Sequence, residues 1–174
     1  MALNSEAEQA KTPFLTRLKN RGIESIFKPL GVKPFQSVET LIKLSAEQFD
    51  SAQHSIQTVE ERFSSHIYNN PLIIRSLKDA IKRDVKMQLI CGPEFDPKNI
   101  ELIKLIRAQR IDLFQLDKNP PFHFNVVDRT SIKEEDYHGE AENYRKGYFI
   151  SMDFGNMYVF KFNNLLALAQ QQSA

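Results

Sequence analysis

The sequence has little cysteine, little glycine and no long apolar run, and each shortage excludes a class of protein. Its 174 residues include one cysteine, Cys91, so a disulfide within one chain is impossible and a reducing, cytoplasmic location is expected. Cys91 ends the apolar run VKMQLIC, which is typical of a small buried side chain rather than a reactive thiol. No apolar run is long enough to span a bilayer, and the polar start MALNSEAEQAKTP lacks the apolar core of a secretion signal.

The common signatures of nucleotide, cofactor and thiolate metal sites are also missing. Six glycines leave little room for a phosphate-cradling loop, and neither GxGxxG, GxxxxGK[ST] nor GxSxG occurs. No CxxC pair is present, which excludes a thiolate zinc site. We therefore expect no cofactor. The net charge of +1 means that no strong overall field attracts a polyanion.

From residue 54 onward, segments with strand and helix character alternate along the chain. Strands are expected at 55–63, 85–91, 111–116, 122–128, 129–135 and 147–152. Helices are expected at 71–84, 97–110 and 153–170. The resulting order β-α-β-α-β-β-β-β-α indicates an α/β domain in which the first half of the sheet is largely parallel.

The residues before this domain are expected to form a separate attachment. We divide the chain into a disordered tail at 1–11, an N-terminal helical attachment at 12–52 and the α/β domain at 53–174. The attachment would hold helices at 13–21 and 38–52, with a linker at 27–35. The second helix carries an apolar face that needs a partner, either the main core or a second subunit. That face consists of Val38, Leu41, Ile42 and Phe49.

The stretch PPFHFNVVDRTSIKEEDYHGE, residues 120–140, contains two of the four histidines. Alternate side chains of a strand share a face. Phe122, Phe124 and Val126 would then point into a core, while His123 and Asn125 face a pocket or solvent together.

Residues after this strand can return toward it. If they do, Glu134, Glu135 or His138 can approach His123 and Asn125, and these five residues are our candidates for a catalytic site. A histidine held by a carboxylate beside a second histidine can bind a phosphate or a metal ion. The charged run KEED is equally typical of a solvated turn, in which case both histidines are surface residues.

The block from NNPLIIRSLKDAIKRDVKMQLICGP through IDLFQL to FHFNVVD resembles the phospholipase D-like family. In that family a later strand carries H-x-K-x4-D, and the apolar pair before its aspartate is similar to Val126-Val127-Asp128. The resemblance covers about residues 54–170. It implies a phospholipase D-like mixed sheet flanked by helices. It also implies a homodimer, because family members with one motif copy tend to pair.

The chain departs from the family at the reacting positions. If Asp128 takes the place of the family's aspartate, the nucleophilic histidine falls on Pro121 and the lysine falls on His123. Proline has no atom that attacks phosphorus, and histidine is a weaker permanent charge than lysine. The resemblance therefore implies a degenerate, non-catalytic copy of the motif.

The candidates for binding a phosphate-bearing ligand extend beyond this stretch. His66 follows the first core strand, at the carboxyl end of a parallel sheet, where ligands collect. The full set of ligand-binding candidates is His66, Asn70, His123, Asn125 and Asp128. Basic residues on two helices are either a nucleic-acid surface or ordinary solvated faces. They are Arg75, Lys78, Lys82, Arg83, Lys104, Arg107 and Arg110.

Three functions remain open on these observations. The first is a degenerate domain that binds a phosphate-bearing ligand, a nucleic acid or nucleotide, or acts as a dimerisation and interaction module. The second is an active phosphodiesterase or nuclease with a rearranged site around His123. The third is a metal-binding protein that uses His123, His138 and a carboxylate. We favour the first, because Pro121 occupies the nucleophile position and the segment is locally acidic.

Overall fold

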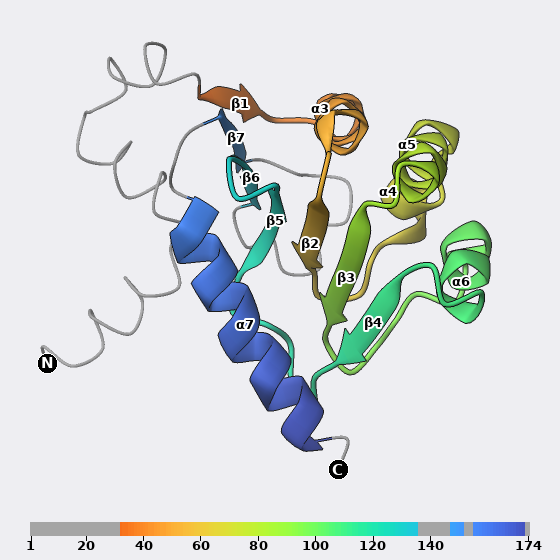
Figure 1. Ribbon diagram of the computed structural model, residues 1–174, viewed down its shortest axis with the longest axis vertical. Coiled ribbons are helices and arrows are strands. Elements are labelled where there is room, and N and C mark those ends of the chain that lie inside the picture. The colour runs from red at the N-terminus through yellow and green to blue at the C-terminus, as the bar shows by residue number, and fades with distance from the viewer. Residues whose placement is uncertain (1–31, 136–146, 152–154, 173–174) are drawn as a thin grey trace, which may run out of the picture.

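The computed structural model describes residues 32–135, 147–151 and 155–172, which form a mixed sheet with helices on both faces (Figure 1). The strands are β1 (Lys33–Phe35), β2 (Ser55–Val59), β3 (Lys86–Cys91), β4 (Asp112–Gln115), β5 (His123–Val127), β6 (Ser131–Glu135) and β7 (Gly147–Ser151). The helices are α3 (Val38–Ser51), α4 (Ser65–Tyr68), α5 (Pro71–Lys82), α6 (Ile100–Arg107) and α7 (Gly155–Gln172).

The seven strands lie in the order β1-β7-β6-β5-β2-β3-β4. β2, β3 and β4 pair in parallel, while β5 pairs antiparallel with both β2 and β6. The predicted α/β class and the parallel first half are therefore confirmed. Because β5 runs against β2, the amino end of β5 lies beside the carboxyl end of β2, and this juxtaposition builds the candidate site.

Helix α3 packs into the main core. It begins at Val38, the predicted start, and the Ser37 hydroxyl caps it by accepting a hydrogen bond from the backbone N–H of Thr40. Its apolar side chains Leu41 and Phe49, each 1% exposed, are buried in the same cluster as the inner face of α5. Burial of each such side chain stabilises the fold by roughly 1.5–3 kcal/mol. Of the two partners expected for this face, the structure shows the main core.

The opposite face of the sheet is covered by α7 (Figure 1). Tyr158 and Phe162 of this helix pack on Phe124 and Val126 of β5. The rings of Phe124 and Tyr158 meet edge to face, with centroids 5.3 Å apart. The predicted inward direction of Phe124 and Val126 is confirmed, and β5 is thereby fixed between two helical layers.

Two short elements lie where none was predicted. β1 falls within the expected linker and pairs with β7, so Lys33–Phe35 belong to the same sheet as the α/β domain. α4 follows β2, and its Tyr68 reaches back toward the end of that strand. Elements of three or four residues carry too little periodicity to be read from sequence, and tertiary contacts define them.

The β5–β6 connection is a tight turn at Asp128 and Arg129, both of which have positive φ. The backbone N–H of Thr130 bonds the carbonyl of Val127, which closes a type I′-like hairpin turn. α7 begins directly against this turn, and Gly155 lies so close to it that a Cβ at this position would overlap the carbonyl of Arg129. Glycine is therefore required at that contact.

The structure also bears on Cys91 and on the shortage of long apolar runs. Cys91 is fully buried, and burial raises the pKa of its thiol to about 11, as expected for an unreactive side chain. Among the described helices, none combines the length and apolar character needed to cross a bilayer.

Candidate functional site

Six polar side chains form two adjacent rows on the face of the sheet that α3 and α4 cover. In the first row, Thr58 of β2 lies opposite Asn125 of β5, which lies opposite Lys133 of β6. In the second row, Glu60 continues the register of β2 opposite His123, and His123 pairs directly with Glu135. All six side chains are at most 4% exposed. This is an enclosed polar cluster in the middle of the protein.

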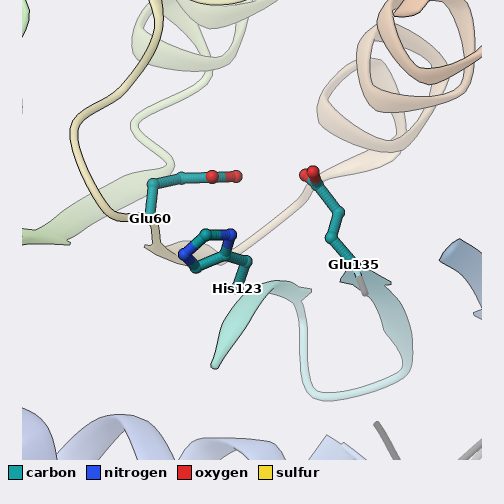
Figure 2. A group of neighbouring side chains, drawn as sticks. All are labelled: Glu60, His123 and Glu135. Atoms are coloured by element: carbon teal, nitrogen blue, oxygen red, sulfur yellow. The ribbon is translucent and has the colours of Figure 1, made fainter. Parts of the chain in front are cut away.

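The second row brings together groups that can ligate a metal ion (Figure 2). One atom each from Glu60, His123 and Glu135 lies within 4.8 Å of the other two. Two carboxylates and one imidazole form a typical oxygen and nitrogen ligand set for a divalent ion.

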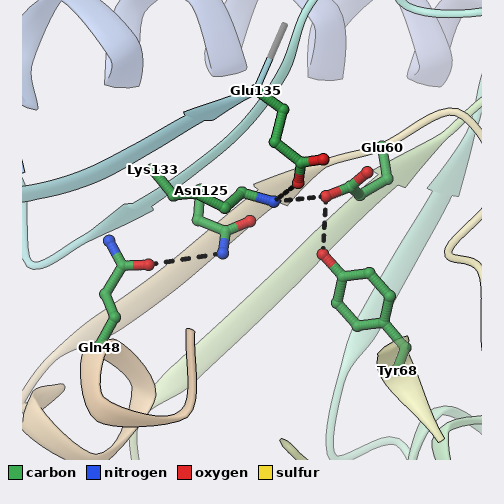
Figure 3. Close-up of polar contacts among 6 residues, drawn as sticks. All are labelled: Gln48, Glu60, Tyr68, Asn125, Lys133 and Glu135. Carbon is green, nitrogen blue, oxygen red and sulfur yellow. Dashed lines mark hydrogen bonds and ion pairs between the residues drawn. The ribbon is translucent and has the colours of Figure 1, made fainter. Parts of the chain in front are cut away.

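Lys133 reaches from the first row into the second (Figure 3). Its ammonium donates to a carboxylate oxygen of Glu60 at 2.6 Å and to a carboxylate oxygen of Glu135. The Lys133 side chain is 1% exposed. The Lys133 ammonium therefore occupies the position between the two carboxylates.

The charge state of Lys133 follows from a balance of two effects. Burial disfavours the ammonium, but the nearby charges of Glu135 and Glu60, with their hydrogen bonds, outweigh it and raise the pKa of Lys133 above its ordinary value. Lys133 is consequently protonated at neutral pH. The pair of carboxylates and the ammonium stabilise one another in a region where each alone would be costly.

Neighbouring helices hold the two rows in place. Tyr68 of α4 donates its hydroxyl hydrogen to Glu60 at 2.8 Å. Gln48 of α3 accepts from the Asn125 amide at 3.5 Å (Figure 3). The Gln48 amide also donates to the Ser131 hydroxyl at 3.1 Å. The polar rows are thus tied to both helices above them, which fixes the orientation of Glu60 and Asn125.

The structure separates the two candidate glutamates. Glu135 lies beside His123, as predicted for one of the pair. Glu134 lies opposite Phe124, and alternation along β6 directs it to the α7 face of the sheet. Glu134 therefore does not orient His123. His123 and Asn125 do share a face, but that face is closed by helices, so neither is at the surface.

Other candidate residues have structural roles or lie away from the cluster. Asp128 is at the far end of β5, where its carboxylate accepts the backbone N–H groups of Gln53, His54 and Ser55 at 2.6–2.8 Å. Burial opposes ionisation there, but these three bonds outweigh it and hold the pKa of Asp128 below its ordinary value. Asn70, a candidate ligand-binding residue, caps α5 by accepting a hydrogen bond from the backbone N–H of Leu72.

Of the other two candidate histidines, the structure describes only His66, which does not join the cluster. His66 lies on α4 and is exposed, outside the group of potential ligands formed by Glu60, His123 and Glu135. His138 lies outside the described residues.

Most of the basic helical residues are engaged with acidic groups. Lys78 and Lys104 both pair with Glu101, at 2.9 and 2.6 Å. Lys82 pairs with Asp79, and Arg75 pairs with Asp50. Arg83 donates to the carbonyls that end α3, namely those of Phe49, Asp50 and Ala52. Within the described part of the chain, Arg107 and Arg110 are exposed and make no ion pair.

Sequence reasoning missed Glu60, Tyr68 and Lys133. Lys133 belongs to the run KEED, which is typical of a solvated turn, yet β6 places it on a buried face. The signal that could have found it is the alternation in SIKEE, which puts Lys133 and Glu135 on one side of the strand. Glu60 can be recognised only when β5 is known to lie beside β2.

Known structures share this architecture. No protein-family model and no curated protein matches the sequence. TrmBL2, an archaeal chromatin protein that binds DNA, is 17% identical with a TM-score of 0.62. The match covers 95% of this chain, which spans only 66% of that protein's chain. Nuc from Salmonella typhimurium, a phospholipase D family member, is 19% identical with a TM-score of 0.59.

The Nuc match covers 79% of this chain and 94% of the Nuc chain. NucT from Helicobacter pylori is 13% identical with a TM-score of 0.62, and the match covers 79% of this chain and 96% of that one. The chain has a phospholipase D-like fold. The predicted fold class and the resemblance found in the sequence are both confirmed.

Replacement of Lys133 tests how strongly the buried charges depend on one another. Lys133→Met leaves two buried carboxylates without their shared ammonium, and we expect it to lower the free energy of unfolding by about 3–5 kcal/mol in urea denaturation. Adding Glu60→Gln and Glu135→Gln should recover most of that loss, because no unpaired charge remains. Lys104→Met, which breaks an exposed pair with Glu101, is the matched control and should cost under about 1 kcal/mol. Equal losses for Lys133→Met and Lys104→Met would contradict the expected coupling.

Proposed function

We propose that this chain is a phospholipase D-like domain that does not hydrolyse phosphodiesters and acts by binding, with nucleic acid as its ligand. The observation that carries the proposal is the pair of residues that stand at the family's reacting positions, at the amino end of β5. Pro121 stands at the position that the family resemblance assigns to the nucleophile. His123 stands at the lysine position and is 2% exposed between Glu60 and Glu135.

The local electrostatics support a non-hydrolytic role. A phosphodiester needs an accessible nucleophile and cationic groups that stabilise its oxygens. Here two carboxylates lie where a phosphate would have to enter, and a charge contact at about 4 Å costs about 4 kcal/mol at an intermediate dielectric. The Lys133 ammonium is directed at those carboxylates. A phosphate therefore gains little from this cluster, and nucleic acid would bind elsewhere on the domain.

Support for nucleic acid as the ligand comes from the fold and from one part of the surface. TrmBL2, which shares this fold, is a DNA-binding chromatin protein. Arg107 and Arg110, at the end of α6 and just beyond it, are exposed and make no ion pair among the described residues. They are available for phosphate contacts, whereas Arg75 and Lys82 are paired with acids.

The absence of hydrolysis is the first expected result. Wild-type protein incubated with bis-p-nitrophenyl phosphate or short DNA should release no product above buffer, with or without a chelator. His123→Ala should behave identically, because no turnover exists to be lost, and His66→Ala serves as the exposed-histidine control. Chelator-resistant hydrolysis that disappears in His123→Ala but persists in His66→Ala would establish a rearranged phosphodiesterase instead.

DNA binding should depend on α6 and not on the buried cluster. In fluorescence anisotropy with a short duplex, we expect salt-sensitive binding that His123→Ala leaves unchanged. Arg107→Ala/Arg110→Ala should weaken it and lower the slope of log affinity against log salt by up to about 1.8, for two phosphate contacts. Arg75→Ala/Lys82→Ala removes the same charge and should have a smaller effect. No binding at low salt would remove nucleic acid as the ligand.

A second candidate function, dimerisation, is favoured by the outer face of α7. Met157, Phe160 and Leu168 are 41%, 66% and 50% exposed. At 100° per residue these side chains fall within one stripe of the helix. The homodimer implied by the family resemblance could use this face, because exposed apolar side chains along one face of a helix can mark association sites.

The α7 stripe makes the dimer testable. Phe160→Ser/Leu168→Ser should raise the dimer dissociation constant at least about tenfold in sedimentation equilibrium, since two large apolar side chains leave the interface. Leu72→Ser, on exposed Leu72 of α5, is the control and should leave self-association unchanged. A wild-type chain that stays monomeric at high concentration would exclude this role.

A further inference from the structure

We propose that Glu60, His123 and Glu135 form a binding site for a divalent transition-metal ion such as Zn²⁺ or Mn²⁺, and that Lys133 occupies the cation position when no ion is bound. This inference does not depend on whether the chain binds nucleic acid. It names Glu60 and Glu135 as the carboxylate ligands beside His123, whereas His138, the other ligand suggested by the sequence, lies outside the described residues.

The geometry of the second row supplies the ligands. The three ligating atoms lie within 4.8 Å of one another. Ligand atoms around one zinc ion, each about 2.0–2.2 Å from it, stand roughly 3–4 Å apart, so small side-chain rotations would close the site. Each of the three comes from a strand or its immediate end, so the sheet register holds them together. Figure 2 shows the side chains of Glu60 and Glu135 on either side of the His123 ring.

The ligand types select the class of ion. One imidazole and two carboxylates suit Zn²⁺, Mn²⁺ and related ions, whereas Ca²⁺ and Mg²⁺ prefer oxygen ligands alone. The Tyr68 hydroxyl, which donates to Glu60, orients that carboxylate in the way that outer-shell partners orient metal ligands.

The first row explains where Lys133 would go. Among the described residues, Thr58 Oγ1 and Asn125 Oδ1 are buried oxygen atoms without a hydrogen-bond partner. Both lie in the same cross-strand row as Lys133, and Asn125 is its direct partner in β6–β5 pairing. Buried polar atoms normally have partners, so these two oxygens call for an explanation.

A displaced ammonium would give the Asn125 oxygen a partner. When an ion takes the carboxylates of Glu60 and Glu135, the Lys133 side chain can turn back along its own row and donate to Asn125. The ammonium then keeps a hydrogen bond without leaving the buried face. The cluster thus has two arrangements, one with the ammonium between the carboxylates and one with the ion there.

Direct titration tests the site. Chelator-washed full-length protein, dialysed against Zn²⁺ or Mn²⁺ alone and analysed for metal content, should bind about one ion per chain in a saturable manner. His123→Ala and Glu60→Gln should each weaken binding at least about tenfold, since each removes a ligand. His66→Ala, which changes an exposed histidine outside the cluster, should leave binding unchanged.

The competing lysine gives a result of opposite sign. Lys133→Met should bind the ion at least about tenfold more tightly than wild type, because no ammonium has to be displaced. Asn125→Ala should weaken binding in the wild-type background and have no effect in Lys133→Met, a coupling that a double-mutant cycle measures. Far-ultraviolet circular dichroism confirms that each variant is folded. The titration of the wild-type chain tests the site even if a variant fails to fold.

Two results would overturn the proposal. One is the absence of saturable Zn²⁺ or Mn²⁺ binding by the folded wild-type chain. The other is binding that survives both His123→Ala and Glu60→Gln and is lost in His138→Ala, which would place the ion elsewhere.

Discussion

The buried ammonium of Lys133 between Glu60 and Glu135 is the interaction on which the arrangement of the central strands depends. It links the end of β2 to β6 across β5. A charge taken out of water is costly unless it is paired, so any register that separates these groups carries a heavy penalty. A shift of one residue would turn the polar rows into the apolar layer under α7. The ion pair therefore specifies the register of β2, β5 and β6 as well as stabilising their pairing.

Strand β5 has two faces with different tasks. Phe124 and Val126 pack beneath α7 and anchor the strand in an apolar layer. His123 and Asn125 take part in polar rows that α3 and α4 close from the other side. The polar cluster is thus held by the central strands of the sheet. A site held in this way depends little on loop positions and strongly on sheet register.

The order of elements and the fold class could be predicted because their signals are local. The helices expected to start at residues 38 and 71 do start there, and the side chains of Ser37 and Asn70 cap them. The two faces of β5 follow from alternation alone. The composition of the cluster could not be predicted, because Glu60 and Lys133 meet His123 only through the order in which strands enter the sheet. Their charges suggested solvent, and tertiary pairing overrides that preference.

The late position of β5 in the chain and its central place in the sheet have a consequence for synthesis. β2 pairs on one side with β3 and on the other with β5. Ile56 therefore cannot pair with Val127 until the chain has been synthesised beyond β5. The pairing of β1 comes later still in synthesis, since Lys33 pairs with Phe149. Such distant pairings slow folding, and an open strand edge can recruit the edge of another chain. Until β5 has been synthesised, the edge of β2 that β5 later covers has no partner within the sheet, so an exposed pairing edge is a consequence of this strand order.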